Sequence, residues 1–466
     1  MEKQLEMASG HPDKAHTNLP RVLGFWDIIG IIVGGVIGSG IFIVPAEVAR
    51  AVQAPLLILA VWVVGGLLSF FGAVSSSELG AAYPQAGGIY VYLREAYGPL
   101  FAFLFGWTLF LVIDAGAIAT LAVAFSTSYL NHFLQVSALS AKLISVALIL
   151  FLCAINYVGV KTGAFVQNLL TIIKFAALVG ICGLVFIFAK DGHVSNFFQP
   201  APGRFSMNLL GQFGVAMIAT LWAYKGWEAA TYSAGEVKKP EKNLPLGLLI
   251  GTMICVVIYI LTNLAYLYVV PAGTIANSPK IASDVMNLIV GPVGASLIAF
   301  IILFSIMGAA NATVMTSPRV YFAMARDGLF FKKVAEVHPK FQTPHISIVI
   351  LGIWSAILSL TGTFEQLFTY VIFGEWVFFG LTVAAVIILR KKRPDLPRPY
   401  KTWGYPVTPI IFVLAALFIS LNSLINAFGN AFRGLFIILL GVPVYLYWRK
   451  KQRKTEVRAQ PPLPQA

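Results

Sequence analysis

The sequence predicts an all-α, polytopic membrane protein with twelve transmembrane helices. Of its 466 residues, 58% are hydrophobic and 11% are charged, whereas about 25% of residues are charged in an average soluble domain. Apolar stretches recur between residues 27 and 448, and each has the roughly 20 residues that cross a bilayer. The composition therefore excludes a disordered chain, a secreted disulfide scaffold and an ordinary cytosolic enzyme.

The predicted spans follow one another in order, separated by polar, glycine-bearing or proline-bearing segments. Their expected bounds are 27–49, 55–79, 99–126, 140–158, 164–189, 208–234, 245–269, 287–324, 345–361, 366–390, 407–426 and 431–448. Residues 83–88, followed by an amphipathic run to Gly98, predict a short interfacial or re-entrant helix, and 276–287 predict a similar cap.

The basic residues orient the chain. Most of the 33 Lys and Arg residues fall on one side of the membrane if the N-terminus is cytosolic, as the positive-inside rule requires. The clusters lie at 238–242, 326–340, 390–401 and 449–458. We therefore expect a multi-pass protein of the cytoplasmic membrane with cytosolic tails at 1–22 and 449–466. The net charge of +14 then needs no nucleic-acid partner.

The sequence predicts neither a metal nor another cofactor. The three cysteines, at positions 153, 182 and 255, lie inside apolar spans and form no CxxC pair, which is typical of small buried hydrophobes. No histidine falls in the interior of a predicted span, and only His345 stands at the first residue of one, so a haem or metal site at membrane depth is not expected.

The first span contains a segment that disfavours a continuous helix. In Gly38-Ser39-Gly40, two glycines lower the helix propensity by roughly 2 kcal/mol relative to alanines. Gly30, Gly34 and Gly38 also fit a plain helix-packing face. If the helix breaks, unwound backbone at this depth must be satisfied by protein or by a water-filled cavity.

Such a break would suit a zwitterion. Free N–H groups near Ser39, Gly40 and Ile41 would form a partial positive pole for a carboxylate. Free carbonyls near Val36 and Ile37 would accept an ammonium group. Residues 222–227 of the sixth span form a second candidate break. Paired interruptions at corresponding positions of two halves, spans 1–5 and 6–10, indicate a transporter's midplane site.

Several motifs together resemble the L-type amino acid transporter family of the amino acid–polyamine–organocation superfamily. They are GGVIGSGIF at 34–42, SELG at 77–80, GGIY at 87–90, AYKGW at 223–227, KPEKNLP at 239–245 and ARDG at 325–328. The resemblance implies a LeuT-like 5+5 inverted repeat, with halves at 23–190 and 204–390, and two further helices within 405–448. It also implies sodium-independent amino acid exchange by a bacterial member that needs no accessory subunit.

The resemblance also assigns roles to individual residues. Lys174 in the fifth span would take the place of a coupling cation and touch the broken first helix. Trp222 would close over the substrate, Glu375 and Trp376 would line the distal pocket, and Asn311 would brace the first helix. The expected substrate-binding set is Val36, Ile37, Gly38, Ser39, Gly40, Ile41, Trp222, Ala223, Tyr224, Lys225 and Glu375.

Lys225 departs from the family pattern, which commonly has a small residue at this position. It either pairs with Glu375 or Glu228 as a structural bridge, which leaves small neutral substrates, or it meets the side-chain carboxylate of an acidic substrate. We favour the bridge because desolvated charges seek fixed partners. Three roles are open for Asp114: to cap a local bend of the helix, to belong to a proton path, or to accept hydrogen bonds from neighbouring serines. Glu78 is expected to pair with Arg94 or Arg326.

The function predicted from these features is transport of small L-amino acids by alternating access, as sodium-independent exchange. The alternatives are proton-coupled symport through Lys174, because a buried lysine can lose its proton, and selection of acidic amino acids through Lys225. Lys174 argues against a sodium symporter. The sequence has no pore-lining ring of the kind that would indicate a channel. No HExxH or Gly-x-Ser-x-Gly motif suggests an enzyme.

Overall fold

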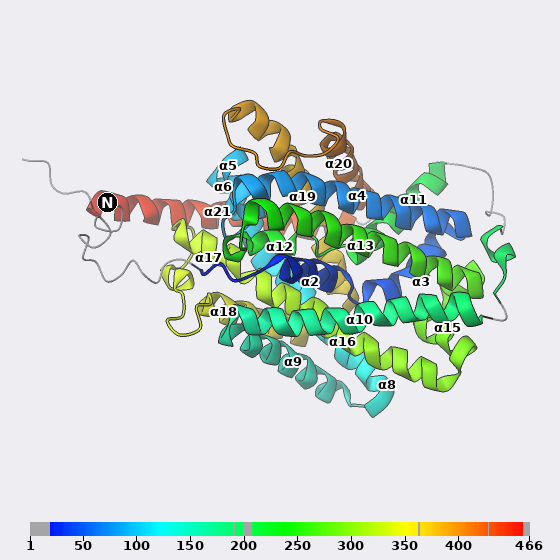
Figure 1. Ribbon diagram of the computed structural model, residues 1–466. Helices are drawn as coiled ribbons and strands as arrows, with labels where there is room; N and C mark the ends of the chain where they lie inside the picture. The colour runs from blue at the N-terminus through cyan, green and yellow to red at the C-terminus, as the bar shows by residue number, and fades with distance from the viewer. Residues whose placement is uncertain (1–18, 190–191, 199–206, 362–363, 427, 460–466) are drawn as a thin grey trace, which may run out of the picture.

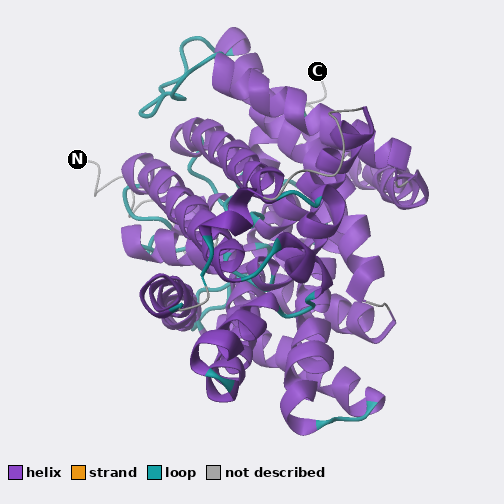
Figure 2. Ribbon diagram, turned by 90° about the vertical axis from the view of Figure 1, so that its right-hand side faces the viewer, coloured by secondary structure: helices purple, strands orange, loops and turns teal. Residues whose placement is uncertain are grey.

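The computed structural model describes residues 19–189, 192–198, 207–361, 364–426 and 428–459. Long helices lie side by side along one common direction (Figure 1), and the view along them shows a bundle of helices joined by short loops (Figure 2). The described part of the chain forms no β-sheet, only one isolated bridge between Leu23 and Val237. The predicted all-α class is therefore confirmed.

The helices follow the predicted order. The first six predicted spans correspond to α2 (Phe25–Val36) with α3 (Gly40–Val52), α4 (Pro55–Ala82), α6 (Pro99–Thr108) with α7 (Asp114–Ala124), α9 (Ala138–Val158), α10 (Val160–Phe188), and α11 (Met207–Ala223) with α12 (Ala229–Tyr232). The last six correspond to α13 (Pro240–Val269), α16 (Pro292–Thr316) with α17 (Pro318–Arg326), α18 (His345–Thr361), α19 (Phe364–Lys392), α20 (Val407–Asn426) and α21 (Phe428–Ala459).

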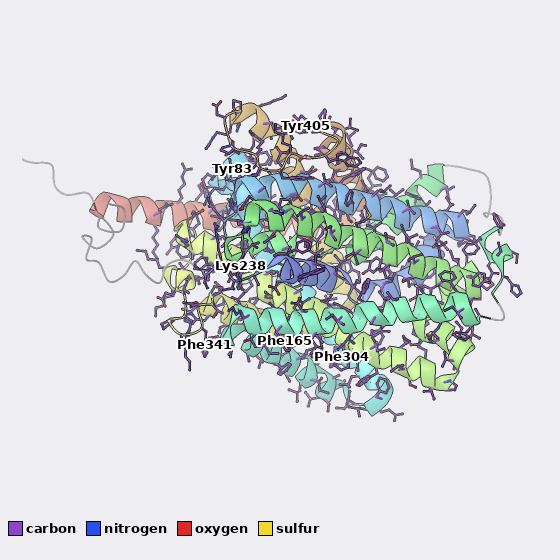
Figure 3. The ribbon with its side chains drawn as sticks, viewed as in Figure 1. Tyr83, Phe165, Lys238, Phe304, Phe341 and Tyr405 are labelled. Atoms are coloured by element: carbon purple, nitrogen blue, oxygen red, sulfur yellow. The ribbon has the colours of Figure 1, made fainter. Side chains whose placement is uncertain are left out.

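Eight helices among the described residues are long and apolar enough to cross a membrane, and the bent pair α2–α3 makes a ninth. Helix α18, with 17 residues, is shorter than any of these eight. The protein is thus a multi-pass helical membrane protein, while the count of twelve spans and the inverted repeat stay predictions. Tyr83, Lys238 and Phe341, from three different connections, lie toward the same end of the bundle (Figure 3).

Short helices occupy both predicted caps. Helix α5 (Ile89–Tyr97) follows Gly88, as the amphipathic run predicts. On the opposite side, α14 (Ala272–Asn277) and α15 (Ile281–Val290) cover the stretch expected to form an outer cap.

Helix α2 lies in the middle of the bundle against α10, α13 and α16. The Thr171 hydroxyl of α10 lies 3.0 Å from the Gly30 carbonyl oxygen, and the Asn168 amide donates to Asp27 over 2.8 Å. Asn311 of α16 donates to Gln167 of α10 over 2.8 Å. It therefore braces α2 only indirectly, because Gln167 lies 3.4 Å from the Gly30 carbonyl oxygen.

Glu78 has different partners from those predicted. Its carboxylate accepts from Arg390 over 2.6 and 2.8 Å and from the Thr402 backbone over 2.7 Å, with Arg398 at 3.3 Å. The prediction of Arg94 or Arg326 was wrong because the end of α4 faces α19 and the loop after it. The interpretation of Glu78 as a structural residue agrees with these contacts.

Candidate functional site

The first predicted break is present. Helix α2 ends at Val36, α3 begins at Gly40, and the two are bent by 41°. Within the described chain, no backbone carbonyl accepts from the N–H groups of Ser39, Gly40 or Ile41. The start of α3 therefore presents free donors together with the positive end of its helix dipole.

The second predicted break is also present. Helix α11 ends at Ala223, and a turn leads to α12 at Ala229. Gly226 lies within this turn at φ 122°, a conformation that L side chains rarely adopt. A Cβ on Gly226 would lie 2.7 Å from the carbonyl carbon of Gly35. The two breaks are therefore in direct backbone contact, which only glycine permits.

A tyrosine joins the two breaks from the side. The Tyr259 hydroxyl of α13 lies 2.7 Å from the Val36 carbonyl oxygen and 3.2 Å from the Ala223 carbonyl oxygen. The Val36 carbonyl also accepts from the Gly38 N–H over 2.8 Å. The Ala223 carbonyl retains a second lone pair for another donor. Tyr259 was not among the residues predicted from the sequence, because no motif or spacing shows which side chain of α13 faces the breaks.

A small cavity of about 60 Å³ lies at the junction of the breaks. Of the predicted substrate-binding set, the residues that line it are Val36, Gly38, Ser39, Gly40, Trp222, Ala223 and Lys225. Its other walls include Asp114, Glu228, the α16 residues Ala309, Ala312, Thr313 and Thr316, and Ser317 after that helix. The Ser39 hydroxyl is buried and has no hydrogen-bond partner in the described structure. It is thus available to a ligand.

The remaining predicted residues do not line this cavity. Ile37 and Ile41 are fully buried in the core, and the Tyr224 hydroxyl donates to the Trp62 carbonyl over 3.2 Å. Glu375 is bound to Lys225, and Trp376 stacks on Phe412. Substrate binding through these side chains stays a prediction, because none of these residues is among those that line the cavity.

Lys174 contacts the first helix, and its role in place of a coupling cation stays a prediction. Its side chain is fully buried, and its ammonium donates to the Gly34 carbonyl at the C-terminal end of α2, with the Ser305 carbonyl oxygen at 3.5 Å. The Ser305 hydroxyl lies 3.2 and 3.1 Å from the carbonyl oxygens of Ile37 and Gly38. A fixed positive charge therefore meets the negative end of the α2 dipole.

Lys225 forms a bridge with two carboxylates. Its ammonium lies 2.9 Å from Glu375 and 3.3 Å from Asp114, and Asp114 also accepts from the Ser317 hydroxyl. Glu228, the other partner considered, instead accepts from the Gly226 backbone over 3.0 Å. Of the two partners that the sequence suggested, Glu375 pairs with Lys225 and Glu228 does not. Asp114 is a second partner that was not predicted.

The comparisons with known proteins agree with this geometry. The family profile described as amino acid permease matches residues 23–445. The b(0,+)-type amino acid transporter 1 of Mus musculus is 34% identical over 415 residues, 88% of this chain and 84% of the relative. The serine/threonine exchanger SteT of Bacillus subtilis (strain 168) is 35% identical over 439 residues, 93% and 98% of the two chains. The cystine/glutamate transporter of Homo sapiens is 31% identical over 448 residues, 95% and 88%.

The chain therefore belongs to the amino acid permease family, and the predicted resemblance to L-type amino acid transporters is confirmed. It is a membrane transporter of amino acids rather than an enzyme.

The contact between the breaks leads to a first prediction. Gly226→Ala is expected to lower the stability by about 2 kcal/mol or more, because the methyl group meets the backbone of Gly35 and the φ angle is strained. Thermal unfolding of the purified protein measures the loss. Gly211→Ala in α11 is the matched control, since nothing lies within 4 Å of its added Cβ. Equal melting temperatures for the two variants would contradict the contact.

The Lys225 bridge leads to a second prediction. Lys225→Met leaves Glu375 and Asp114 without their cation, so we expect a loss of about 3–5 kcal/mol. In the double variant with Glu375→Gln, the loss is expected to be smaller than the sum of the two single losses by about 1–3 kcal/mol. A double-mutant cycle of thermal unfolding measures this coupling, and additive losses would show that the bridge is not formed.

Proposed function

We propose that this protein exchanges small neutral L-amino acids across the cytoplasmic membrane, independently of sodium and by alternating access. One observation carries the proposal: free backbone N–H groups and the unpartnered Ser39 hydroxyl border a small cavity between two helix breaks in contact. In this proposal the substrate carboxylate binds at Ser39, Gly40 and Ile41. Its ammonium group binds the Ala223 carbonyl, whose second lone pair is available beside Tyr259, and faces the Val36 carbonyl.

The size of the cavity supports a small substrate. One ordered water needs about 10–15 Å³ by the same measure, so about 60 Å³ holds roughly four to six waters. The space for this number of waters is close to the space that the few non-hydrogen atoms of alanine or serine need. The relative SteT is named as a serine/threonine exchanger, which agrees with this size.

The charges around the cavity support a neutral substrate. Lys225 is already held by Glu375 and Asp114. Asp114 and Glu228 place two carboxylates in the walls of the cavity beside Lys225. An acidic side chain entering here would meet more negative than positive groups. The bridge therefore favours neutral amino acids over aspartate or glutamate.

Lys174 supports transport that does not use sodium. Its ammonium group donates to the carbonyl oxygens of Gly34 and Ser305. Backbone carbonyls of this kind are the ligands that coordinate Na⁺ in related transporters with broken helices. A bound ammonium takes up both the space and the charge of such an ion. Exchange follows if the empty carrier reorients slowly.

The proposal includes the arrangement in the membrane. The halves 23–190 and 204–390 form the inverted repeat, 405–448 adds two helices, and the tails at 1–22 and 449–466 are cytosolic. Substrate binding at the contact of α2–α3 with α11–α12 agrees with this symmetry, since each half contributes one break. We propose that the chain works in the bilayer without an accessory subunit.

Counterflow in proteoliposomes tests the proposed function. Vesicles loaded with unlabelled L-alanine or L-serine are expected to take up the labelled amino acid several-fold faster than empty vesicles, equally with sodium or potassium outside. A requirement for sodium, or uptake into empty vesicles driven by a pH gradient, would contradict sodium-independent exchange.

The variant Lys225→Ala tests the substrate class in the same assay. If Lys225 is only part of a bridge, the variant is expected to lose transport of every substrate to a similar degree. Loss of aspartate or glutamate uptake with alanine and serine uptake retained would assign Lys225 to an acidic substrate instead.

A further inference from the structure

A pocket of about 650 Å³ lies between the end of α21 and the start of α18. Its other walls come from the π-helical turn η2 (Leu109–Ile113) and from the connection after α17, which includes the short helix η6 (Lys332–Ala335). Its volume is in the range of ligand-binding pockets, about 300–1,000 Å³. Phe341 of the same connection lies toward the end of the bundle that also carries Lys238 (Figure 3).

Aromatic rings form one wall of the pocket. The ring centroid of Phe331 lies 5.0 Å from that of Trp448 and 5.2 Å from that of Phe330. The centroid of Phe330 lies 5.9 Å from that of Phe110, so the four rings make one continuous apolar surface. Phe331 is exposed, although it is large and apolar. The chemistry that fits this wall is hydrocarbon.

The helices on both flanks of the pocket present apolar side chains outward. On α18, Ile350 lines the pocket, and Val349 and Ile353 beside it are exposed. On α21, Leu446 and Tyr447 are exposed. Exposed apolar side chains on the spans of a membrane protein contact the acyl chains of the bilayer. The pocket is therefore placed between two lipid-facing surfaces.

The rim of the pocket is basic. Lys332, Lys333 and Lys451 line it, and none of its lining residues within the described chain is acidic. Lys332 and Lys333 are exposed, and no carboxylate of the described residues forms an ion pair with either. The Lys451 ammonium lies 5.0 Å from the centre of the Trp448 ring, which places it at the edge of the aromatic wall.

The two lysines of η6 can meet a single phosphate group. They are consecutive residues that line the same pocket. Consecutive Cα atoms are 3.8 Å apart, and the flexible four-carbon stem of a lysine is longer than this spacing. Two ammonium groups therefore reach one anion without a change of the backbone.

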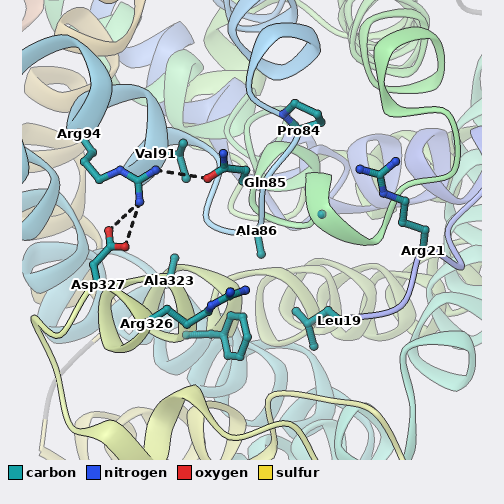
Figure 4. Close-up of a pocket in the computed structure, with 12 residues that line it drawn as sticks. Leu19, Arg21, Pro84, Gln85, Ala86, Val91, Arg94, Ala323, Arg326 and Asp327 are labelled. Atoms are coloured by element: carbon teal, nitrogen blue, oxygen red, sulfur yellow. Dashed lines mark hydrogen bonds and ion pairs between the residues drawn. The ribbon is translucent and has the colours of Figure 1, made fainter. Parts of the chain in front are cut away.

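The acidic residues nearest in sequence do not neutralise these lysines. Asp327 faces a different pocket, shown in Figure 4, where it accepts from Arg94 over 2.7 and 3.0 Å. Tyr90 donates to the same carboxylate over 2.8 Å. Glu336, three residues after Lys333, is exposed and does not line the lysine-rimmed pocket. The positive charge at the rim is therefore available to a ligand.

We propose that this pocket binds one anionic phospholipid, whose phosphate is held by Lys332 and Lys333 and whose acyl chain lies along the aromatic wall and Ile350. A free anion would leave the aromatic wall uncovered, and an uncharged apolar molecule would make no use of the lysines. In the orientation proposed above, the site lies in the cytosolic leaflet, where basic residues attract anionic lipids. Lipid binding requires no transport, so the inference stands apart from the proposed function.

Lipid titration of the purified, delipidated protein tests the site. The protein in micelles of an uncharged detergent is titrated with radiolabelled dioleoyl phosphatidylglycerol and, separately, with dioleoyl phosphatidylcholine. One saturable site is expected, about 10-fold tighter for the anionic lipid because two lysines face its phosphate. The variant Lys332→Gln/Lys333→Gln is expected to lose this preference and to keep the affinity for phosphatidylcholine.

The control variant Lys238→Gln/Lys242→Gln removes the same charge from exposed residues at the start of α13, outside the pocket. It is expected to keep the preference for phosphatidylglycerol. Equal affinity of the wild type for the two lipids would overturn the proposal. An equal loss of preference in both double variants would also overturn it, because it would show a general attraction to the basic surface.

The apolar half of the site is tested by filling it. Ile350→Trp is expected to weaken binding of both lipids by about 10-fold, because the larger side chain takes the place of one or two chain methylenes. Ile353→Trp, on the exposed face of the same helix and outside the pocket, is the matched control and is expected to bind as the wild type does. Unchanged binding by Ile350→Trp would overturn the proposal. If size-exclusion chromatography shows that this variant does not fold, the two lysine variants decide.

Discussion

The structure depends on one constraint: backbone that is unwound at membrane depth must find polar partners within the protein. Two helices break in this protein, and the breaks are placed against each other, with Gly226 in contact with the backbone of Gly35. Carbonyls at the breaks are satisfied by Tyr259, Ser305 and Lys174. The N–H groups at the start of α3 are left for a ligand. An unsatisfied polar group in hydrocarbon costs several kcal/mol, so the same requirement that stabilises the breaks also underlies the binding site that we propose.

The two buried lysines serve different parts of this arrangement. Lys174 faces carbonyls and the C-terminal end of α2, so its charge is stabilised by dipoles. Lys225 faces the carboxylates of Glu375 and Asp114, which join α11–α12 to α19 and α7. An isolated charge at this depth is costly, and the pairing explains how a lysine is tolerated beside a substrate cavity. In the proposed function, Lys225 is held by carboxylates and its charge therefore does not select an acidic substrate.

Much of this could be predicted from local sequence. The glycines around Ser39, the run 222–227 and the amphipathic stretch after Gly88 predict the two breaks and helix α5, because helix propensity and periodicity depend on neighbouring residues. The partners of Glu78 could not be predicted, since Arg390 is 312 positions away and the rotation of α4 about its axis is not encoded in its spacing. The same reason hid Tyr259 and the contact of Asp114 with Lys225. Asn311 hydrogen-bonds to Gln167 of α10 rather than to α2, and the sequence of α16 does not show which neighbouring helix this side chain faces.

The most direct test of the central claim is an experimental structure of the protein with a bound small amino acid, for example L-alanine, determined by electron cryomicroscopy. The account predicts that the carboxylate lies within hydrogen-bond distance of the N–H groups of Ser39, Gly40 and Ile41. It also predicts that the ammonium group faces the carbonyls of Val36 and Ala223, with Lys225 still bound to Glu375. An amino acid whose carboxylate is held by Lys225, or one bound away from both breaks, would contradict it.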